Sequence, residues 1–230
     1  MYNWQNLALL VAALVNLFMS AFVFGRGIKN RVNLFFGLLT FFNFTWSFGL
    51  LLSRANSDMS LVSVFARSTY VSALAIILSL FYFVRNFPFY SSKINKVVSV
   101  MLWSSAALLS IFVFTNGFIY DIGRAYSDYE YRSLYTTYGF CIYAIYFSFV
   151  ALYAIIILFK KYKITEGLIR KQSKLLLLAI IVGLIFGSYF DLFIQYSGDF
   201  RLNWLGPIFT VLMNFVAFYF VISSKEKISD

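Results

Sequence analysis

The feature that most constrains this chain is a series of seven apolar runs, each long enough to cross a lipid bilayer as a helix. A helix rises about 1.5 Å per residue, so some 20 residues cover the roughly 30 Å of hydrocarbon. Strands of a membrane barrel would be shorter and would alternate apolar with polar residues. The seven runs are Gln5–Gly25, Asn33–Leu52, Leu61–Val84, Val97–Gly117, Leu134–Phe159, Leu175–Tyr196 and Trp204–Ser223. The sequence therefore predicts an all-α fold, an integral membrane bundle of seven transmembrane helices.

The composition supports a membrane protein and argues against catalysis. Hydrophobic residues make up 61% of the chain and charged residues 12%, against about 45–50% and 25% in soluble domains. The chain has no His and a single Cys, which excludes His-based metal sites, His general bases and intrachain disulfides. The last run contains no Lys that could hold a retinal Schiff base. We therefore expect a non-enzyme without a cofactor or a metal site.

Basic residues alternate between the two sides of the predicted bundle. Most of the 19 Lys and Arg residues fall in the connections after the first, third and fifth runs and after the last run. Cytoplasmic loops carry the excess of Lys and Arg, so the N-terminus is expected outside and the C-terminus inside the cell membrane. The net charge of +10 is then a signal of topology, and no nucleic acid partner is expected.

The chain divides into one seven-helix domain, residues 1–223, and a short cytoplasmic tail, residues 224–230. The longest outer connection, Phe118–Ser133, is too short for a domain of its own and is rich in tyrosine. Tyrosines suit the membrane interface, where the ring is buried and the hydroxyl is wet. The connection is thus either part of an aromatic belt or a lid over an outward-facing cavity.

Two charged residues lie within the predicted spans, at a similar depth in the outer half of the membrane. Arg67 lies about two turns into the third span and Asp191 lies near the outer end of the sixth. An intramembrane charge costs about 2.5–3.5 kcal/mol at mid-depth, so each needs a compensating interaction. One interpretation is an ion pair that fixes helix packing. The other is a ligand cavity, open to the outside, near Arg67, Asp191, Trp46 and Tyr70.

Three asparagines share a depth near the midplane. Asn16, Asn43 and Asn214 lie about halfway along the first, second and seventh spans. Amides in lipid seek partners on other helices, with bonds worth about 0.6 kcal/mol on average. We expect an interhelical polar node among these three helices, either as structural support or as a two-state element of a sensor. In the sixth span, Gly183 and Gly187 recur at four-residue spacing before Asp191, which predicts close packing against a neighbouring helix.

Several short motifs, in this order along the chain, resemble a known family. The second span carries Trp46 in FFNFTWSFGLLL, and the third closes with FYFVRNFP, ending at Pro88. The segment Arg170–Leu175 enters the sixth span, and Trp204–Pro207 opens the seventh. With these features the chain resembles the seven-helix N-terminal sensor region of bacterial and archaeal histidine kinases and diguanylate cyclases.

The resemblance implies a receptor module in the lipid bilayer. A small-molecule or lipid ligand, or a membrane cue, would bias the bundle, and the last helix would pass the change to a cytoplasmic kinase or cyclase output domain. The resemblance supplies no catalytic residue. Only SSKEKISD follows Ile222, so both an excised input module and a stand-alone receptor stay open. A small transporter or lipid-handling protein is the alternative function, and a structural assembly subunit is a third.

Overall fold

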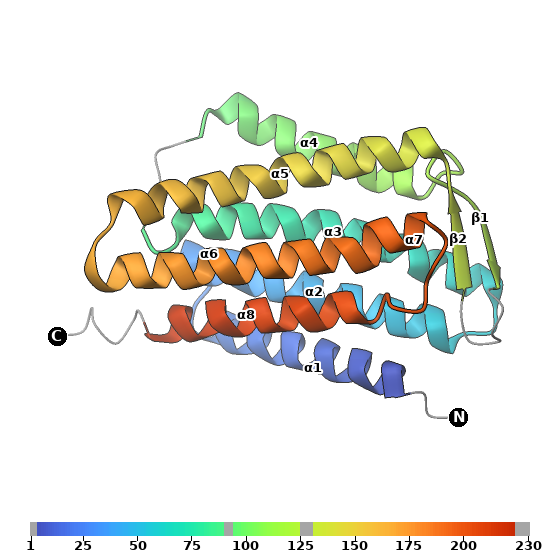
Figure 1. The fold of residues 1–230 in the computed structure, drawn as a ribbon, viewed down its shortest axis with the longest axis horizontal. Helices are drawn as coiled ribbons and strands as arrows, with labels where there is room; N and C mark the ends of the chain where they lie inside the picture. Colours follow the sequence, from blue (N-terminus) through green and yellow to red (C-terminus); the bar gives the residue numbers. More distant parts are fainter. Residues whose placement is uncertain (1–3, 90–93, 125–130, 224–230) are drawn as a thin grey trace.

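Seven long helices lie side by side along the longest axis of the molecule, and a small β-hairpin covers one end (Figure 1). The computed structural model describes residues 4–89, 94–124 and 131–223. The elements in chain order are α1 Trp4–Gly25, α2 Arg31–Ala55, α3 Met59–Asn86, α4 Lys96–Val113, β1 Ile119–Arg124, β2 Tyr131–Tyr135, α5 Thr137–Ile164, α6 Gly167–Ser188, the π-helical turn η1 Tyr189–Phe193, α7 Ile194–Tyr196 and α8 Leu205–Ser223.

Each predicted span falls on one long helix, and α6, η1 and α7 together form the sixth span, Gly167–Tyr196. All seven are long and apolar enough to cross a membrane, so the prediction of seven spans is confirmed. Helix α1 begins at the end of the bundle where the hairpin lies, here called the hairpin end, and α8 ends at the opposite end (Figure 1). An odd number of spans requires this separation. The assignment of the hairpin end to the outside stays a prediction from the distribution of basic residues.

Polar side chains mark where the helices begin. Asn30, Asp58, Asn95 and Thr136 are the N-cap residues of α2, α3, α4 and α5, and each accepts a hydrogen bond from a backbone N–H of the first turn. These caps satisfy donors that have no partner within the helix. At Asp58 the hydroxyl and the backbone N–H of Ser60 both donate to the carboxylate, which holds the pKa of Asp58 below its usual range.

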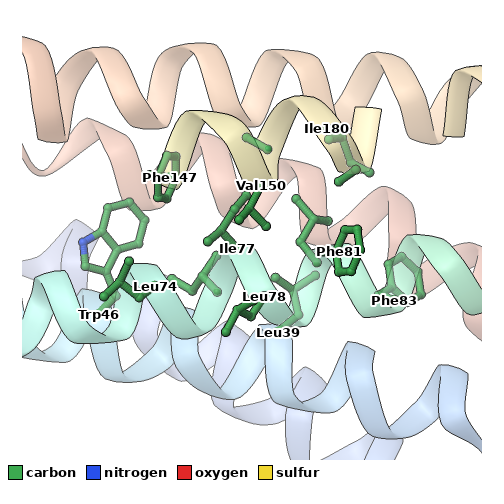
Figure 2. Packing of buried hydrophobic residues seen from close by; sticks show 14 of the residues in the cluster. Leu39, Trp46, Leu74, Ile77, Leu78, Phe81, Phe83, Phe147, Val150 and Ile180 are labelled. Atoms are coloured by element: carbon green, nitrogen blue, oxygen red, sulfur yellow. The ribbon is translucent and has the colours of Figure 1, made fainter. Parts of the chain in front are cut away.

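Helix α3 is the central element of the bundle. It packs against α2, α4, α5 and β1, and its last third is buried almost without interruption. Figure 2 shows Ile77 and Phe81 of α3 lying between Leu39 of α2 and Val150 of α5, all within one core cluster. Lipid tails are as apolar as these side chains, so close van der Waals packing, rather than escape from water, holds the helices together.

A buried lysine closes the end of α3 that lies opposite the hairpin. The Nζ atom of Lys161, on α5, donates to the carbonyl oxygens of Val84 at 2.7 Å, Arg85 at 2.9 Å, Phe87 at 2.9 Å and Phe89 at 2.5 Å. The last turn of a helix leaves such carbonyls without intrahelical partners. Sequence reasoning counted Lys161 only as a topology charge. The structure shows that it caps α3 from the neighbouring helix.

At the hairpin end a buried arginine joins three segments. Arg54, in the last turn of α2, donates to the side chains of Gln5 and Asn6 on α1 and of Asn203 before α8, with distances of 3.2 Å to Asn6 and 2.8 Å to Asn203. Arg54 lies beyond the predicted second span, which ends at Leu52, yet it belongs to α2 and its side chain is buried. The contact fixes the start of α8 against α1 and α2.

The outer connection departs from the purely helical prediction. Strands β1 and β2 pair in antiparallel fashion, with Ile119 opposite Tyr135 and a register irregularity between Ile119 and Asp121. The fifth predicted span therefore begins too early at Leu134, because residues Tyr131–Tyr135 belong to β2 and α5 starts at Thr137. The strands satisfy each other's backbone groups where the chain passes between two helices. Residues 125–130 and the predicted tail, 224–230, lie outside the described residues.

The lysine cap of α3 makes a testable prediction about stability. Replacing Lys161 by Met removes the donors of four carbonyl groups but keeps most of the side-chain volume, so the free energy of unfolding should fall by about 2–3 kcal/mol. Denaturant titration of the protein in bicelles measures this change. The matched control is Lys160→Met, because Lys160 is exposed and its replacement should cost little. Equal losses for the two variants would contradict the capping role.

Candidate functional site

A cavity lies inside the bundle, with walls from α2, α3, α5, α6, η1, α7 and α8. Its volume is about 50 Å³, which is room for a few water-sized groups at about 10–15 Å³ each. Along α3 the lining runs from Thr69 to Leu80, and along the sixth span from Gly183 to Gln195. At 1.5 Å per residue these stretches are each about 16–18 Å long. The cavity is therefore a narrow slot parallel to the helices.

The slot is polar at one end and apolar over the rest of its length. Trp46, Tyr70, Asp191 and Gln195 line the part nearer the hairpin. The deeper walls carry apolar side chains, which are Ile76, Leu80, Phe147, Leu184 and Met213. Ligand sites commonly combine apolar walls with a few convergent polar groups, and this slot has that character.

Asp191 is the acidic residue of the slot. It lies in the π-helical turn η1, and its side chain is 8% exposed. Its Oδ1 atom accepts a hydrogen bond from Nε2 of Gln195 at 3.2 Å, whereas Oδ2 is buried and has no hydrogen-bond partner among the described residues. A Cβ atom at Gly206 would collide with this carboxylate. Only a glycine at this position lets the start of α8 lie so close to Asp191. Single π-helical turns inside helices occur frequently at functional sites.

A hydrogen-bonded cluster joins the polar end of the slot to the hairpin. The Oε1 atom of Gln195 accepts from the hydroxyls of Tyr70 at 2.9 Å and Tyr135 at 3.2 Å. The two tyrosine hydroxyls lie 2.5 Å apart, and the hydroxyl of Tyr143 donates to the backbone carbonyl of Tyr70 at 2.8 Å. Tyr135 belongs to β2, so the cluster couples the hairpin to α3 and α7. Tyr135 thereby brings the hairpin into contact with the polar end of the slot.

Sequence reasoning missed Gln195 and Tyr135. Gln195 follows Asp191 by four residues, and side chains at this spacing lie on the same face of a helix. That spacing was a usable signal for Gln195. Tyr135 gave no comparable signal, because its approach to Tyr70 depends on the pairing of β1 with β2.

Comparison with known proteins gives one match. Residues 8–224 match the family model described as the N-terminal 7TM region of histidine kinase. The chain belongs to this family. The resemblance seen in the sequence is thereby confirmed for histidine kinases, and the protein is a multi-pass membrane protein with the character of a signalling sensor module. The family model describes the transmembrane region of these kinases rather than their catalytic part. No curated protein and no solved structure matches the chain.

In this histidine-kinase sensor region, Arg67 does not form the predicted ion pair with Asp191. Its Nη1 atom donates to the carbonyl oxygens of Val113 at 2.7 Å and Thr115 at 2.8 Å, and Nη2 donates to that of Ile119 at 2.8 Å. Helix α4 ends at Val113, and its terminal carbonyls need donors. Arg67 therefore caps α4 from α3. Trp46, Tyr70 and Asp191 line the slot as expected from their depth, whereas Arg67 does not.

The predicted amide node is formed in part. Nδ2 of Asn214 on α8 donates to Oδ1 of Asn16 on α1 at 2.8 Å, so these two residues do join their helices. Asn43 instead donates to the carbonyl of Leu39 within α2 at 2.8 Å. All three amides are fully buried, but equal depth did not determine which faces of the helices meet.

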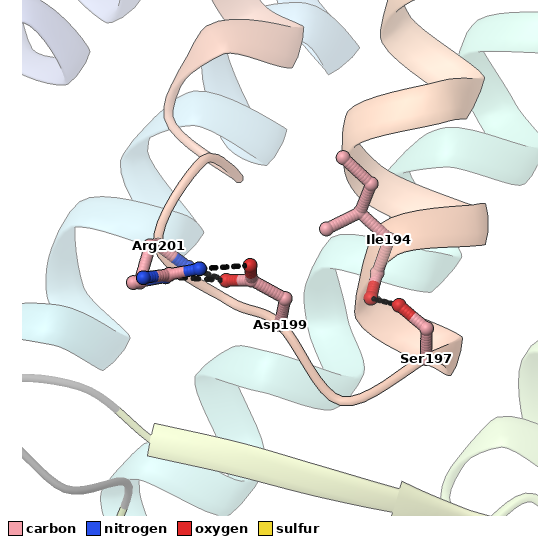
Figure 3. Close-up of polar contacts among 4 residues, drawn as sticks. All are labelled: Ile194, Ser197, Asp199 and Arg201. Carbon is pink, nitrogen blue, oxygen red and sulfur yellow. Dashed lines mark hydrogen bonds and ion pairs between the residues drawn. The ribbon is translucent and has the colours of Figure 1, made fainter.

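The connection between α7 and α8 forms the hairpin-end boundary of the sixth and seventh spans. In Figure 3 the side chain of Arg201 forms two hydrogen bonds with Asp199, at 3.0 and 2.7 Å. The hydroxyl of Ser197 donates to the carbonyl of Ile194 at 2.7 Å (Figure 3). The side chain and backbone N–H of Arg201 hold the pKa of Asp199 below its usual range. Asp199 is thus a satisfied surface carboxylate, in contrast to Asp191.

The position of Arg67 predicts the outcome of a charge exchange. Because Arg67 bonds to backbone carbonyls rather than to Asp191, the double variant Arg67→Asp with Asp191→Arg should be no more stable than either single variant. Denaturant titration in bicelles measures the three unfolding free energies. Losses at sites without shared partners add, so a double variant more stable than both singles would restore the ion-pair interpretation.

The amide contact predicts a small, specific coupling. A double-mutant cycle with Asn16→Ala and Asn214→Ala should give a coupling energy of about 0.6 kcal/mol, the average for interhelical hydrogen bonds in membranes. The same cycle with Asn43→Ala and Asn214→Ala serves as the control and should give a value near zero. A larger coupling in the control cycle would show that Asn43 belongs to the node.

Proposed function

We propose that this region is a receptor module whose cue binds in the slot and whose signal leaves through α8. The observation that carries the proposal is the slot itself, with the incompletely hydrogen-bonded Asp191 at its polar end and Thr210 and Met213 of α8 in its wall. Trp46 and Tyr70 complete the polar end, as the sequence predicts. A bound molecule would therefore contact the last helix directly, and the description of the family as an N-terminal region of histidine kinase supports a kinase output beyond α8.

The contact between α6 and α8 is suited to transmit ligand binding to the position of α8. A Cβ atom at Gly183 would lie 2.9 Å from Cβ of Met213, and one at Gly187 would lie 3.5 Å from Cγ2 of Thr210. The two helices therefore touch where both line the slot, in agreement with the close packing predicted for the glycines. A ligand can shift a helix only if it binds one arrangement better than the other. A molecule that fills the slot favours the arrangement in which α8 lies further from α6.

The distribution of basic residues predicts which end of the bundle faces the outside of the cell. With the N-terminus outside, the hairpin and the polar end of the slot face the exterior, and α8 ends on the cytoplasmic side. A cue from outside or from the outer leaflet would then reach Asp191, and a cytoplasmic kinase partner would read the position of α8. The lipid bilayer surrounds the bundle, because the outer faces of the helices carry large apolar side chains.

A kinase fusion tests the receptor function. With α8 joined to a histidine-kinase catalytic region and the fusion placed in nanodiscs, Ala73→Leu, which fills the slot, should change autophosphorylation about 5-fold or more, a usual size of allosteric coupling. Ala75→Leu is the matched control, since Ala75 lies on the same helix with similar burial but does not line the slot. Equal activity of both variants and the parent fusion would contradict signalling through the slot.

The alternative of a small transporter makes the opposite prediction in a flux assay. A receptor holds its ligand and moves nothing across the bilayer, so proteoliposomes containing the chain should show no uptake above empty liposomes. Candidate solutes for this assay are small organic cations and anions. Uptake that depends on the protein and is abolished by Ala73→Leu would replace the receptor function by transport.

A further inference from the structure

We propose that the slot binds a single-chain amphiphile with a cationic, hydrogen-bond-donating headgroup, such as a primary ammonium group on one alkyl chain. The headgroup lies at Asp191, and the chain lies along α3 and the sixth span toward Leu80 and Gly183. This inference rests on the proposed function, since it names the ligand class of the same site. It concerns binding alone, so it can be tested apart from signalling.

The hydrogen bonds at the polar end determine the headgroup. Gln195 uses its Nε2 atom for Asp191 and its Oε1 atom for Tyr70 and Tyr135. Oδ2 of Asp191 is the buried acceptor left without a hydrogen bond in the described lining. Buried polar groups are costly unless they are hydrogen-bonded, and a buried charge requires a partner of opposite charge. The ligand must therefore bring a donor, and a cation satisfies the carboxylate best.

The other groups at this end also favour a cation over an anion. No Lys or Arg is among the described residues that line the slot, because Arg67 is directed to the carbonyls at the end of α4. Trp46 and Tyr70 add aromatic rings beside Asp191. Ammonium groups are attracted to the faces of such rings. An anionic headgroup would meet a carboxylate and two aromatic rings without a compensating positive charge.

The shape of the slot determines the remainder of the ligand. The slot extends about 16 Å along α3 between apolar walls, yet its volume is only about 50 Å³. Any ligand longer than a few atoms must therefore widen the slot, and one extended alkyl chain needs less widening than a ring system or a two-chain lipid. Ile76, Leu80 and Met213 line the deeper part, where each buried methylene of the chain gains favourable contacts.

Photolabelling of the protein in nanodiscs tests the ligand class. The probe is decylamine with a diazirine at the far end of its chain, and labelled peptides are identified by mass spectrometry. We expect labels on the deep lining, near Leu80 and Met213. Unlabelled decylamine should compete at least about 10-fold better than decyl sulfate at equal density in the membrane, since a hydrogen bond to a charged group is worth at least that factor.

Two pairs of variants distinguish the slot from general partitioning into lipid. Asp191→Asn should lower specific labelling about 10-fold, whereas Asp199→Asn, a change to the carboxylate paired with Arg201, should leave it unchanged. If Asp191→Asn fails to fold, Ala73→Leu provides the second variant and Ala75→Leu its control. Equal competition by decyl sulfate, or full labelling of both slot variants, would overturn the proposal. Labels spread evenly over the lipid-facing surfaces would overturn it as well.

The kinase fusion separates this inference from the proposed function. Decylamine that labels the slot but leaves autophosphorylation unchanged would support the ligand class and contradict the receptor function. Autophosphorylation that responds to Ala73→Leu, without specific labelling by the amine, would support the receptor function and contradict the ligand class.

Discussion

The architecture depends on the requirement that every backbone carbonyl at membrane depth has a donor. The last carbonyl oxygens of α3 and α4 have no N–H donor within their own helix. A cationic side chain from a neighbouring helix donates to them instead. Arg67 of α3 serves the end of α4, and Lys161 of α5 serves the end of α3. The two contacts lie at opposite ends of α3, the most buried helix of the bundle. They join α3, α4 and α5 into one unit through charge-assisted hydrogen bonds, which are stronger than neutral ones.

The same requirement explains why Asp191 stands apart from Arg67. The guanidinium group of Arg67 is occupied by three carbonyl oxygens, so it cannot also neutralise a carboxylate on the sixth span. Asp191 has instead one neutral partner, Gln195, and one buried oxygen without a hydrogen bond among the described residues. A pair of opposite charges in the sequence thus becomes two separate sites, a structural cap and the polar end of a slot.

Sequence reasoning succeeded where a property depends on position along a helix and was incomplete where it depends on rotation about the helix axis. Length and apolarity set the seven spans, and equal depth placed Trp46, Tyr70 and Asp191 in one cavity and Asn16 beside Asn214. Depth alone could not show that Arg67 faces α4 or that Asn43 bonds within α2. The roles of Lys161 and Tyr135 were beyond prediction for a related reason, since each partner is a backbone or side-chain group brought close only by tertiary packing.

Different kinds of contact join the helices on the two sides of the slot. Buried cations join α3, α4 and α5. Helix α8 is joined to its neighbours by the contact of Arg54 with Asn203, by one amide bond at mid-depth, and by the stacking of Phe209 on Phe186 of α6. An interhelical amide bond contributes only about 0.6 kcal/mol, so packing supplies most of the attachment of α8, including the close approach of Met213 to Gly183 of α6. The slot lies between these two groups of helices. Under the receptor function proposed above, a molecule in the slot would contact α3 on one side and Thr210 and Met213 of α8 on the other, so the packing of α8 against α6 is the contact that it would change.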